Sequence, residues 1–315
     1  MRKTILLAAT LVAGACHRDT IIDSDPLPID TAKDASAPTS DAPVKTTAIE
    51  PSTVAPDPIT KPPFPPASGT DVAKVVSGNG GFALDLYRQL AKEPGNLFFS
   101  PSSISTALAM TYAGARGDTA KQMQKTLRFP FTDAKLHEAY GQLLADLQAA
   151  DPKGPDFRVA NRLFGQQSYA FDKAFLELEA QRYGAPLQLV DFAKSEDTRL
   201  TINKWVSVQT HDKIPDLVAK GVLSNDTRLV LTNAVYFKGA WVDQFDKSRT
   251  TDAPFSAFGA TKNVPTMHQA LDARYLETKD AQLVELPYAS GDPDRVFTMT
   301  NVLPRPGVDL AQLEA

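Results

Sequence analysis

The feature that most constrains the fold is an apolar run at residues 229–237, L-V-L-T-N-A-V-Y-F, which only Thr232 and Asn233 interrupt. A continuously apolar run is typical of a strand covered on both faces in a large sheet, whereas a half-exposed strand alternates. Its β-branched and aromatic residues favour a strand over a buried helix, and Gly239 ends it. We therefore expect a central strand here.

Asn233 is the unusual residue of this run. A buried amide without hydrogen-bond partners costs about 1–3 kcal/mol, so Asn233 needs partners. Two interpretations remain open. Asn233 is either an ordinary core asparagine with satisfied hydrogen bonds, or it pins the strand to a helix beneath the sheet.

Residues 1–16 have the pattern of a targeting segment. Arg2 and Lys3 precede an apolar stretch at residues 5–13, which is too short to span a bilayer. Residues 13–16, Ala-Gly-Ala-Cys, resemble the end of a bacterial lipoprotein signal peptide, with alanine where leucine is more common. This resemblance implies cleavage before Cys16 and lipid attachment to Cys16.

Cys16 is the only cysteine, so an exported chain has no internal disulfide, and a lipid role fits the count. The alternative is a plain secretory peptide cleaved near Ala15. One lipid chain holds weakly, so stable anchoring needs further acyl chains. We expect export and a lipid anchor, at the cell surface or in the periplasm. His17 in place of aspartate favours the outer membrane, by resemblance to lipoprotein sorting.

Residues 17–71 read as a disordered tether. Eleven of the 24 prolines lie there, with few large apolar residues, so the segment cannot bury enough surface to offset its ordering entropy. Random-coil scaling gives a reach of about 40 Å. The alternative is a cleaved pro-segment. The net charge of −4 gives no reason to expect a nucleic-acid partner.

Residues 72–315 form the folded domain. Helices are expected at 72–91, 100–114, 118–127, 172–183, 198–210 and 308–315, and strands at 96–99, 157–167, 187–192, 229–237, 274–288 and 296–303. Ser100 and Asp118 are expected caps, and three glycines at 78–81 favour a later start for the first helix. Helices come early and strands late, which indicates an α+β fold around a mainly antiparallel sheet.

No enzyme motif is present. The chain lacks G-x-S-x-G, a phosphate-binding glycine loop, H-E-x-x-H and a cysteine pair for zinc. The four histidines (His17, His137, His211, His268) are scattered. We expect no enzymatic activity, cofactor or metal site.

Three segments together carry a family resemblance. Residues 96–127, N-L-F-F-S-P-S-S-I-S-T-A-L-A-M-T-Y-A-G-A-R-G-D-T-A-K-Q-M-Q-K-T-L, resemble the strand and first paired helices of the serpin family. Residues 229–241 resemble the third strand of its main sheet, and residues 201–218 the helix across that sheet. His211-Asp212 replaces the family's usual Asn-Gly turn. The segments follow the family order across residues 72–315.

The resemblance implies a serpin-like fold, with helices around a large sheet and a second smaller sheet or barrel. It also implies a suicide-substrate inhibitor of serine, sometimes cysteine, proteases, monomeric when complete. In the family, a protease cuts an exposed reactive loop, which inserts as a new strand into the main sheet.

Four residues match positions with family roles. Ser100, Ser103 and Asn233 match the shutter, a polar cluster that links a buried helix to the strands that must part. Trp241 matches the breach, where insertion begins. The alternatives are helix capping for the serines and core packing for Trp241.

Ala315 precedes the family's reactive loop, so no scissile bond can be named. We expect a piece of a longer gene product. The alternative is a truncated gene, whose product would expose the edge of the 229–237 strand and invite pairing with another chain.

Two other functions remain open besides inhibition. One is a non-inhibitory serpin-like lipoprotein that binds partners or acts as a scaffold. The other is a lipoprotein hydrolase, which turnover dependent on Ser100 or Ser103 would reveal.

Overall fold

The computed structural model describes residues 4–13, 69–93, 95–132, 134–257 and 260–314. These residues belong to one compact unit. Cys16 and residues 17–68 of the predicted tether lie outside the described residues. The first helix begins at Gly69, before its predicted start at residue 72.

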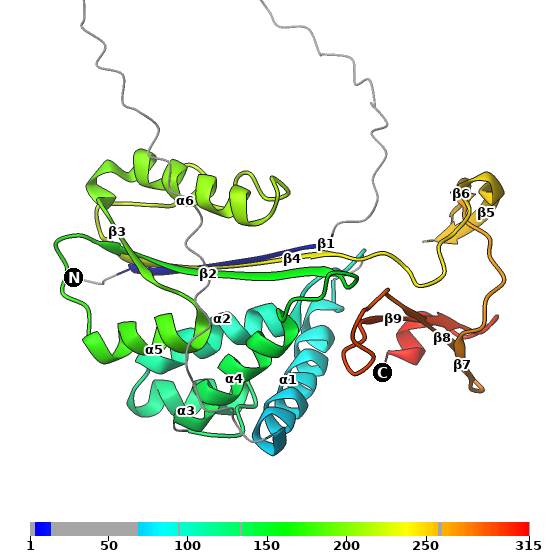
Figure 1. The fold of residues 1–315 in the computed structure, drawn as a ribbon, viewed down its shortest axis with the longest axis horizontal. Coiled ribbons are helices and arrows are strands. Elements are labelled where there is room, and N and C mark those ends of the chain that lie inside the picture. Colours follow the sequence, from blue (N-terminus) through cyan, green and yellow to red (C-terminus); the bar gives the residue numbers. More distant parts are fainter. Residues whose placement is uncertain (1–3, 14–68, 94, 133, 258–259, 315) are drawn as a thin grey trace, which may run out of the picture. The chain divides into compact units, whose positions relative to one another are not determined.

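Helices cover both faces of a four-stranded sheet (Figure 1). On one face, a hydrophobic core joins the sheet to helices that include α1 (Gly69–Leu90), α2 (Pro101–Gly114), α4 (Ala134–Leu147) and α5 (Lys173–Tyr183). The short α3 (Gly117–Thr126) follows α2 on this side. On the other face, α6 (Ser195–Gln209) packs through Ile202 and Val206.

The four-stranded sheet has the order β1-β4-β2-β3. Its strands are β1 (Thr4–Ala13), β4 (Thr227–Lys238), β2 (Asp156–Gln166) and β3 (Leu187–Val190). β2 and β4 are antiparallel, but β1 is parallel to β4 and β3 is parallel to β2. The predicted α+β class is therefore confirmed, while this sheet is mixed instead of mainly antiparallel.

Two smaller sheets are antiparallel. One is the hairpin β5 (Thr251–Ala257) and β6 (Ala260–Thr266). The other joins β7 (Arg274–Glu277), β8 (Ala281–Pro287) and β9 (Thr298–Pro304). Single-turn helices lie at Phe192–Lys194, Lys247–Arg249 and Leu310–Leu313, the last labelled α7.

β4 is the central strand that its apolar run predicts. Leu231 and Val235 belong to the core shared with α1, α2, α4 and α5, whereas Val230 and Ala234 pack on the α6 side. A strand with helices on both faces needs apolar residues at successive positions, which explains the absence of alternation.

The N-terminal segment differs from its prediction. The sequence assigns residues 5–13 to a signal peptide, and the truncated-gene alternative predicts an exposed edge of β4. Thr4–Ala13 instead pairs with β4, from Thr4 opposite Thr227 to Ala13 opposite Phe237. An open strand edge presents unpaired N–H and C=O groups, which an apolar segment without charge or proline can satisfy. Cleavage and lipidation remain predictions.

The glycines of α1 do not delay its start. A Cβ at Gly78 would overlap the backbone carbonyl oxygen of Arg128, and a Cβ at Gly81 would lie 2.7 Å from the Arg128 side chain. The glycines therefore allow close packing of the segment after α3 within one continuous helix.

Other expectations were also wrong. Residues 96–99 form no strand, and residues 274–288 form the hairpin β7–β8. Asp118 does not cap α3, because this helix starts at Gly117 with Arg116 at the cap position. The predicted cap at Ser100 was correct. Asp172 caps α5, and Gly184, whose φ is 61°, follows its last residue.

The described residues show neither a membrane-spanning helix nor a metal-binding cluster. They contain no helix that is both long and apolar enough to cross a membrane. They also contain no group of three or more histidine, cysteine or carboxylate residues placed to hold a metal ion.

Candidate functional site

A buried hydrogen-bonded chain connects α2 to the two central strands. Asn233 of β4 is fully buried, and its Oδ1 accepts a short hydrogen bond from Ser103 Oγ of α2. Its Nδ2 donates to Asn161 Oδ1 of β2 at 2.7 Å. Asn161 Nδ2 then donates to the Tyr183 carbonyl oxygen at the end of α5, at 2.9 Å. Asn233 is thus both satisfied and a pin between strand and helix.

The antiparallel register places the two asparagines together. Asn161 and Asn233 lie directly opposite each other, so their side chains share one face of the sheet. Sequence reasoning missed Asn161. The available signal was the same as for Asn233, an amide inside a strand with buried apolar residues, here Val159 and Leu163.

The two predicted serines have different contacts. Ser103 is buried and bonds Asn233. Ser100 lies at the N-cap of α2, where its Oγ accepts from the Ser103 backbone N–H at 3.2 Å. Ser103 therefore contacts the asparagine pair directly. Ser100 is linked to this pair only through the backbone of Ser103 at the start of α2.

Trp241 lies beyond the end of β4, against the start of the β8–β9 connection. Its ring stacks on Tyr288, with centroids 4.3 Å apart and planes at 17°. The Ala289 N–H donates to the Ala240 carbonyl oxygen at 2.8 Å, and the Val242 N–H to Pro287 at 3.0 Å. Trp241 is half-buried, so it is not an ordinary core residue. A Cβ at Gly239 would meet the Tyr288 ring at 2.6 Å, which explains the glycine.

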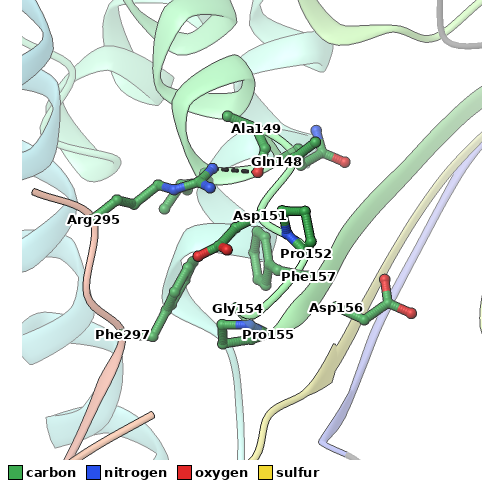
Figure 2. Close-up of a pocket in the computed structure, with 12 residues that line it drawn as sticks. Gln148, Ala149, Asp151, Pro152, Gly154, Pro155, Asp156, Phe157, Arg295 and Phe297 are labelled. Carbon is green, nitrogen blue, oxygen red and sulfur yellow. Dashed lines mark hydrogen bonds between the residues drawn. The ribbon is translucent and has the colours of Figure 1, made fainter. Parts of the chain in front are cut away.

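A row of aromatic rings continues from Trp241 to a pocket. Tyr288 contacts Phe237 of β4, Phe237 contacts Phe297, and Phe297 contacts Phe157 of β2, at centroid distances of 4.9, 5.7 and 5.7 Å. Phe157 and Phe297 line a pocket of about 420 Å³ beside the α4–β2 loop (Figure 2).

Two of the charged residues that line this pocket, Asp151 and Arg295, hold two loops together. Asp151 accepts hydrogen bonds from Ser290 Oγ at 2.8 Å and from the Gly291 N–H at 2.9 Å. These bonds lower the pKa of Asp151 to about 2. Arg295 donates to the Ala149 carbonyl oxygen near the end of α4 (Figure 2). Both groups are engaged, so the pocket is a structural junction at the Trp241 end of the sheet.

A cluster of titratable groups lies between α4 and α5. The carboxyl oxygens of Glu179 are buried without hydrogen-bond partners, and burial raises the pKa of Glu179 to about 9. His137 Nδ1 and the Tyr183 hydroxyl are 2.6 Å apart. Burial, and then the charge of Arg182, lower the pKa of His137 to about 4. At pH 7 both Glu179 and His137 are therefore neutral.

Comparison with known proteins identifies the fold family. The family model described as serpin (serine protease inhibitor) matches residues 77–315. The chain belongs to the serpin family.

Similar proteins agree with this assignment. This serpin is 41% identical over 246 residues to the leukocyte elastase inhibitor of Homo sapiens, covering 76% of this chain and 64% of that protein. It resembles the cleaved form of Serpin 42Da, with a TM-score of 0.71, 34% identity, and coverage of 77% and 65%. It also resembles AtSerpin1 of Arabidopsis in its native stressed conformation, with a TM-score of 0.70, 28% identity, and coverage of 78% and 64%.

The comparisons confirm the family and the fold that the sequence predicts. The chain spans 64% of the length of the human relative, so inhibitory activity and its partners are proposals. The functional roles of Ser100, Ser103, Asn233 and Trp241 remain predictions, as does lipid attachment at Cys16.

Proposed function

We propose that this serpin is part of a suicide-substrate inhibitor of a serine protease. The observation that carries the proposal is the 41% identity to the human leukocyte elastase inhibitor, which extends over 246 residues. The target is therefore a serine protease of the elastase type or a related one, and the serpin itself is not an enzyme. The partner in this proposal is the protease, whose active-site serine becomes acylated by the cut loop.

The sheet has two properties that such a mechanism needs. The backbone edge of β4 pairs with an added parallel strand, here Thr4–Ala13, along nearly its whole length. The Ser103–Asn233–Asn161 chain holds β4 and β2 to α2 from beneath. These hydrogen bonds hold β4 to β2 and α2 on one side, while an inserting strand would pair with the opposite edge of β4.

A lipid anchor is the second part of the proposal. Signal cleavage before Cys16 and acylation of Cys16 would attach the protein to a membrane, with outer-membrane placement favoured by His17. The proline-rich segment at residues 17–68 would then hold the inhibitory domain away from the surface.

Covalent complex formation tests the inhibitory function. The complete gene product, without residues 1–16, is incubated with elastase-, chymotrypsin- and trypsin-type proteases. We expect a protease–serpin adduct that survives SDS electrophoresis. Protease with a blocked active-site serine is the control and should give none. Cleavage without any adduct would favour the alternative, a non-inhibitory serpin-like binding or scaffold lipoprotein.

Mass spectrometry of the exported protein tests the anchor. The mature N-terminus should be an acylated Cys16, and the protein should fractionate with membranes. Cys16→Ser should leave an unlipidated protein. An unmodified thiol at Cys16 in the wild type would contradict the anchor without affecting the inhibitory proposal.

A further inference from the structure

The turn after α6 has an unusual and well-defined backbone. His211 and Asp212 both have positive φ, 48° and 59°. This region is uncommon for residues other than glycine, although histidine, asparagine and aspartate are enriched in it. Ser207 holds the turn, since its Oγ donates to Asp212 Oδ1 at 2.6 Å and its carbonyl oxygen accepts from the Asp212 N–H at 2.8 Å.

The turn places His211 on the α6 side of the sheet. Its ring centroid lies 4.7 Å from that of Tyr236 in β4, and Tyr236 is buried. His211 Nε2 is 3.3 Å from Asp156 Oδ2 at the start of β2. The Asp156 carboxylate also binds Arg158, and it points away from Asp151 and Arg295 (Figure 2). One side chain thus contacts the ends of two central strands.

We propose that His211 and Asp156 form a proton-dependent clamp that fastens the C-terminal turn of α6 to the ends of β2 and β4. A protonated His211 forms an ion pair with the Asp156 carboxylate at this distance, whereas a neutral His211 forms only a polar contact, so the clamp is tighter at lower pH. The clamp does not depend on the proposed inhibitory function.

The surrounding charges define how strong the clamp is. Burial alone would raise the pKa of Asp156, but the hydrogen bonds and charges of Arg158 and His211 lower it, so the carboxylate is ionised from pH 5 to 8. A cation at His211 also lies just past the C-terminus of α6, where the helix dipole is favourable. On the sheet, the charged or titratable neighbours are Arg158, Tyr236 and Lys238, which lies opposite Asp156 in the register. On the turn, they are Asp212 and Lys213.

The expected effect is modest because both partners are partly exposed. The His211 side chain is 44% exposed and that of Asp156 39%. Pairs of this kind change a local equilibrium by about twofold to fivefold. This small change acts on the C-terminal turn of α6, which covers the centre of the sheet. Val206 of α6 and Ile214 pack there on Ala234 in the middle of β4.

Hydrogen exchange of the full chain tests the clamp. The reporters are the amides of residues 210–214, which are hydrogen-bonded within or just after the last turn of α6. After correction for intrinsic exchange rates, we expect about twofold to threefold greater protection at pH 5.5 than at pH 7.5. Asp156→Asn should abolish this difference while keeping the side-chain shape.

Two further variants separate the clamp from general pH effects. His211→Asn should also abolish the difference, and asparagine tolerates positive φ. His268→Asn, at an exposed site, should retain it. Equal protection of the wild type at both pH values, or a pH difference that survives in Asp156→Asn, would overturn the proposal.

Discussion

At the scale of single residues, two buried polar side chains show opposite solutions to the same problem. Asn233 has partners on both sides of its amide, Ser103 and Asn161. Glu179 is equally buried, but its carboxyl oxygens have none. The first arrangement fixes a strand to a helix, whereas the second makes stability depend on pH.

Substitution of Ser100 and of Ser103 distinguishes helix capping from the hydrogen bond that attaches β4 to α2. Ser103→Ala should lower the free energy of unfolding by about 1–3 kcal/mol, because it leaves the buried Asn233 Oδ1 without its donor. Ser100→Ala should cost about 0.5–2 kcal/mol through loss of the α2 cap alone. Urea unfolding measures both. In an Asn233→Ala background, where the Oδ1 acceptor is already absent, Ser103→Ala should cost less than in the wild type, whereas Ser100→Ala should cost the same in both backgrounds.

Glu179 should make the protein less stable as the pH rises. Burial raises the pKa of Glu179 from its ordinary value of 4.5 to about 9 in the folded state, so between these values the folded state holds a proton that the unfolded state has released. The stabilising proton is fully present below pH 4.5 and is lost as the pH passes 9. The slope is at most about 1.4 kcal/mol per pH unit.

Replacement of Glu179 by an apolar residue of similar length tests this. Glu179→Met should raise the urea midpoint, and by more at pH 8 than at pH 6. Glu177→Met, on the exposed side of the same helix, is the control and should leave the pH dependence intact. A Glu179→Met protein with the wild-type pH profile would show that this carboxyl is not the group responsible. His137 contributes a slope of opposite sign below pH 6.5, because its pKa is lowered to about 4.

At the scale of elements, α1 shows how packing overrides helix propensity. Glycine is about 1 kcal/mol less favourable than alanine inside a helix, so Gly80→Ala should stabilise the protein by up to that amount, since nothing lies near its Cβ position. Gly78→Ala should instead destabilise it, because the new methyl group would overlap the Arg128 carbonyl oxygen. Thermal unfolding of the two variants gives the comparison. If both substitutions stabilised the protein, the backbone at Arg128 would have to shift readily to accommodate a methyl group at residue 78.

Elements with strong local signals were the predictable ones. β4 is marked by its apolar run, and α5 by Asp172 at its start and Gly184 at its end. No strands were predicted at β5 and β6. These strands contain Pro254 and Pro265, which disfavour interior strands, but a two-stranded hairpin consists of edge strands, where proline is tolerated. α4 was missed despite Leu136, Tyr140 and Leu144 at helical spacing, a readable signal.

At the scale of the whole molecule, pairing between distant segments was the part that the sequence could not supply. Periodicity identifies Asn233 as buried, but only the register of β2 against β4 brings Asn161 to it. The same holds for Trp241 and Tyr288, which lie on separate segments and meet through an isolated bridge. A local pattern likewise cannot show that an apolar signal-like segment will pair with β4.

Removal of residues 1–16 should therefore change how the chain associates. In the chain as it stands, this deletion takes away the partner of one entire edge of β4, and exposed apolar edges pair with other chains. We expect concentration-dependent dimers or larger species by light scattering after chromatography, whereas the full chain stays monomeric under the same conditions. Added peptide with the sequence of Thr4–Ala13, made soluble by flanking lysines, should suppress this association, and a scrambled peptide should not. A deleted chain that remains monomeric and unfolds at the same urea concentration as the full chain would show that β1 contributes nothing to the sheet.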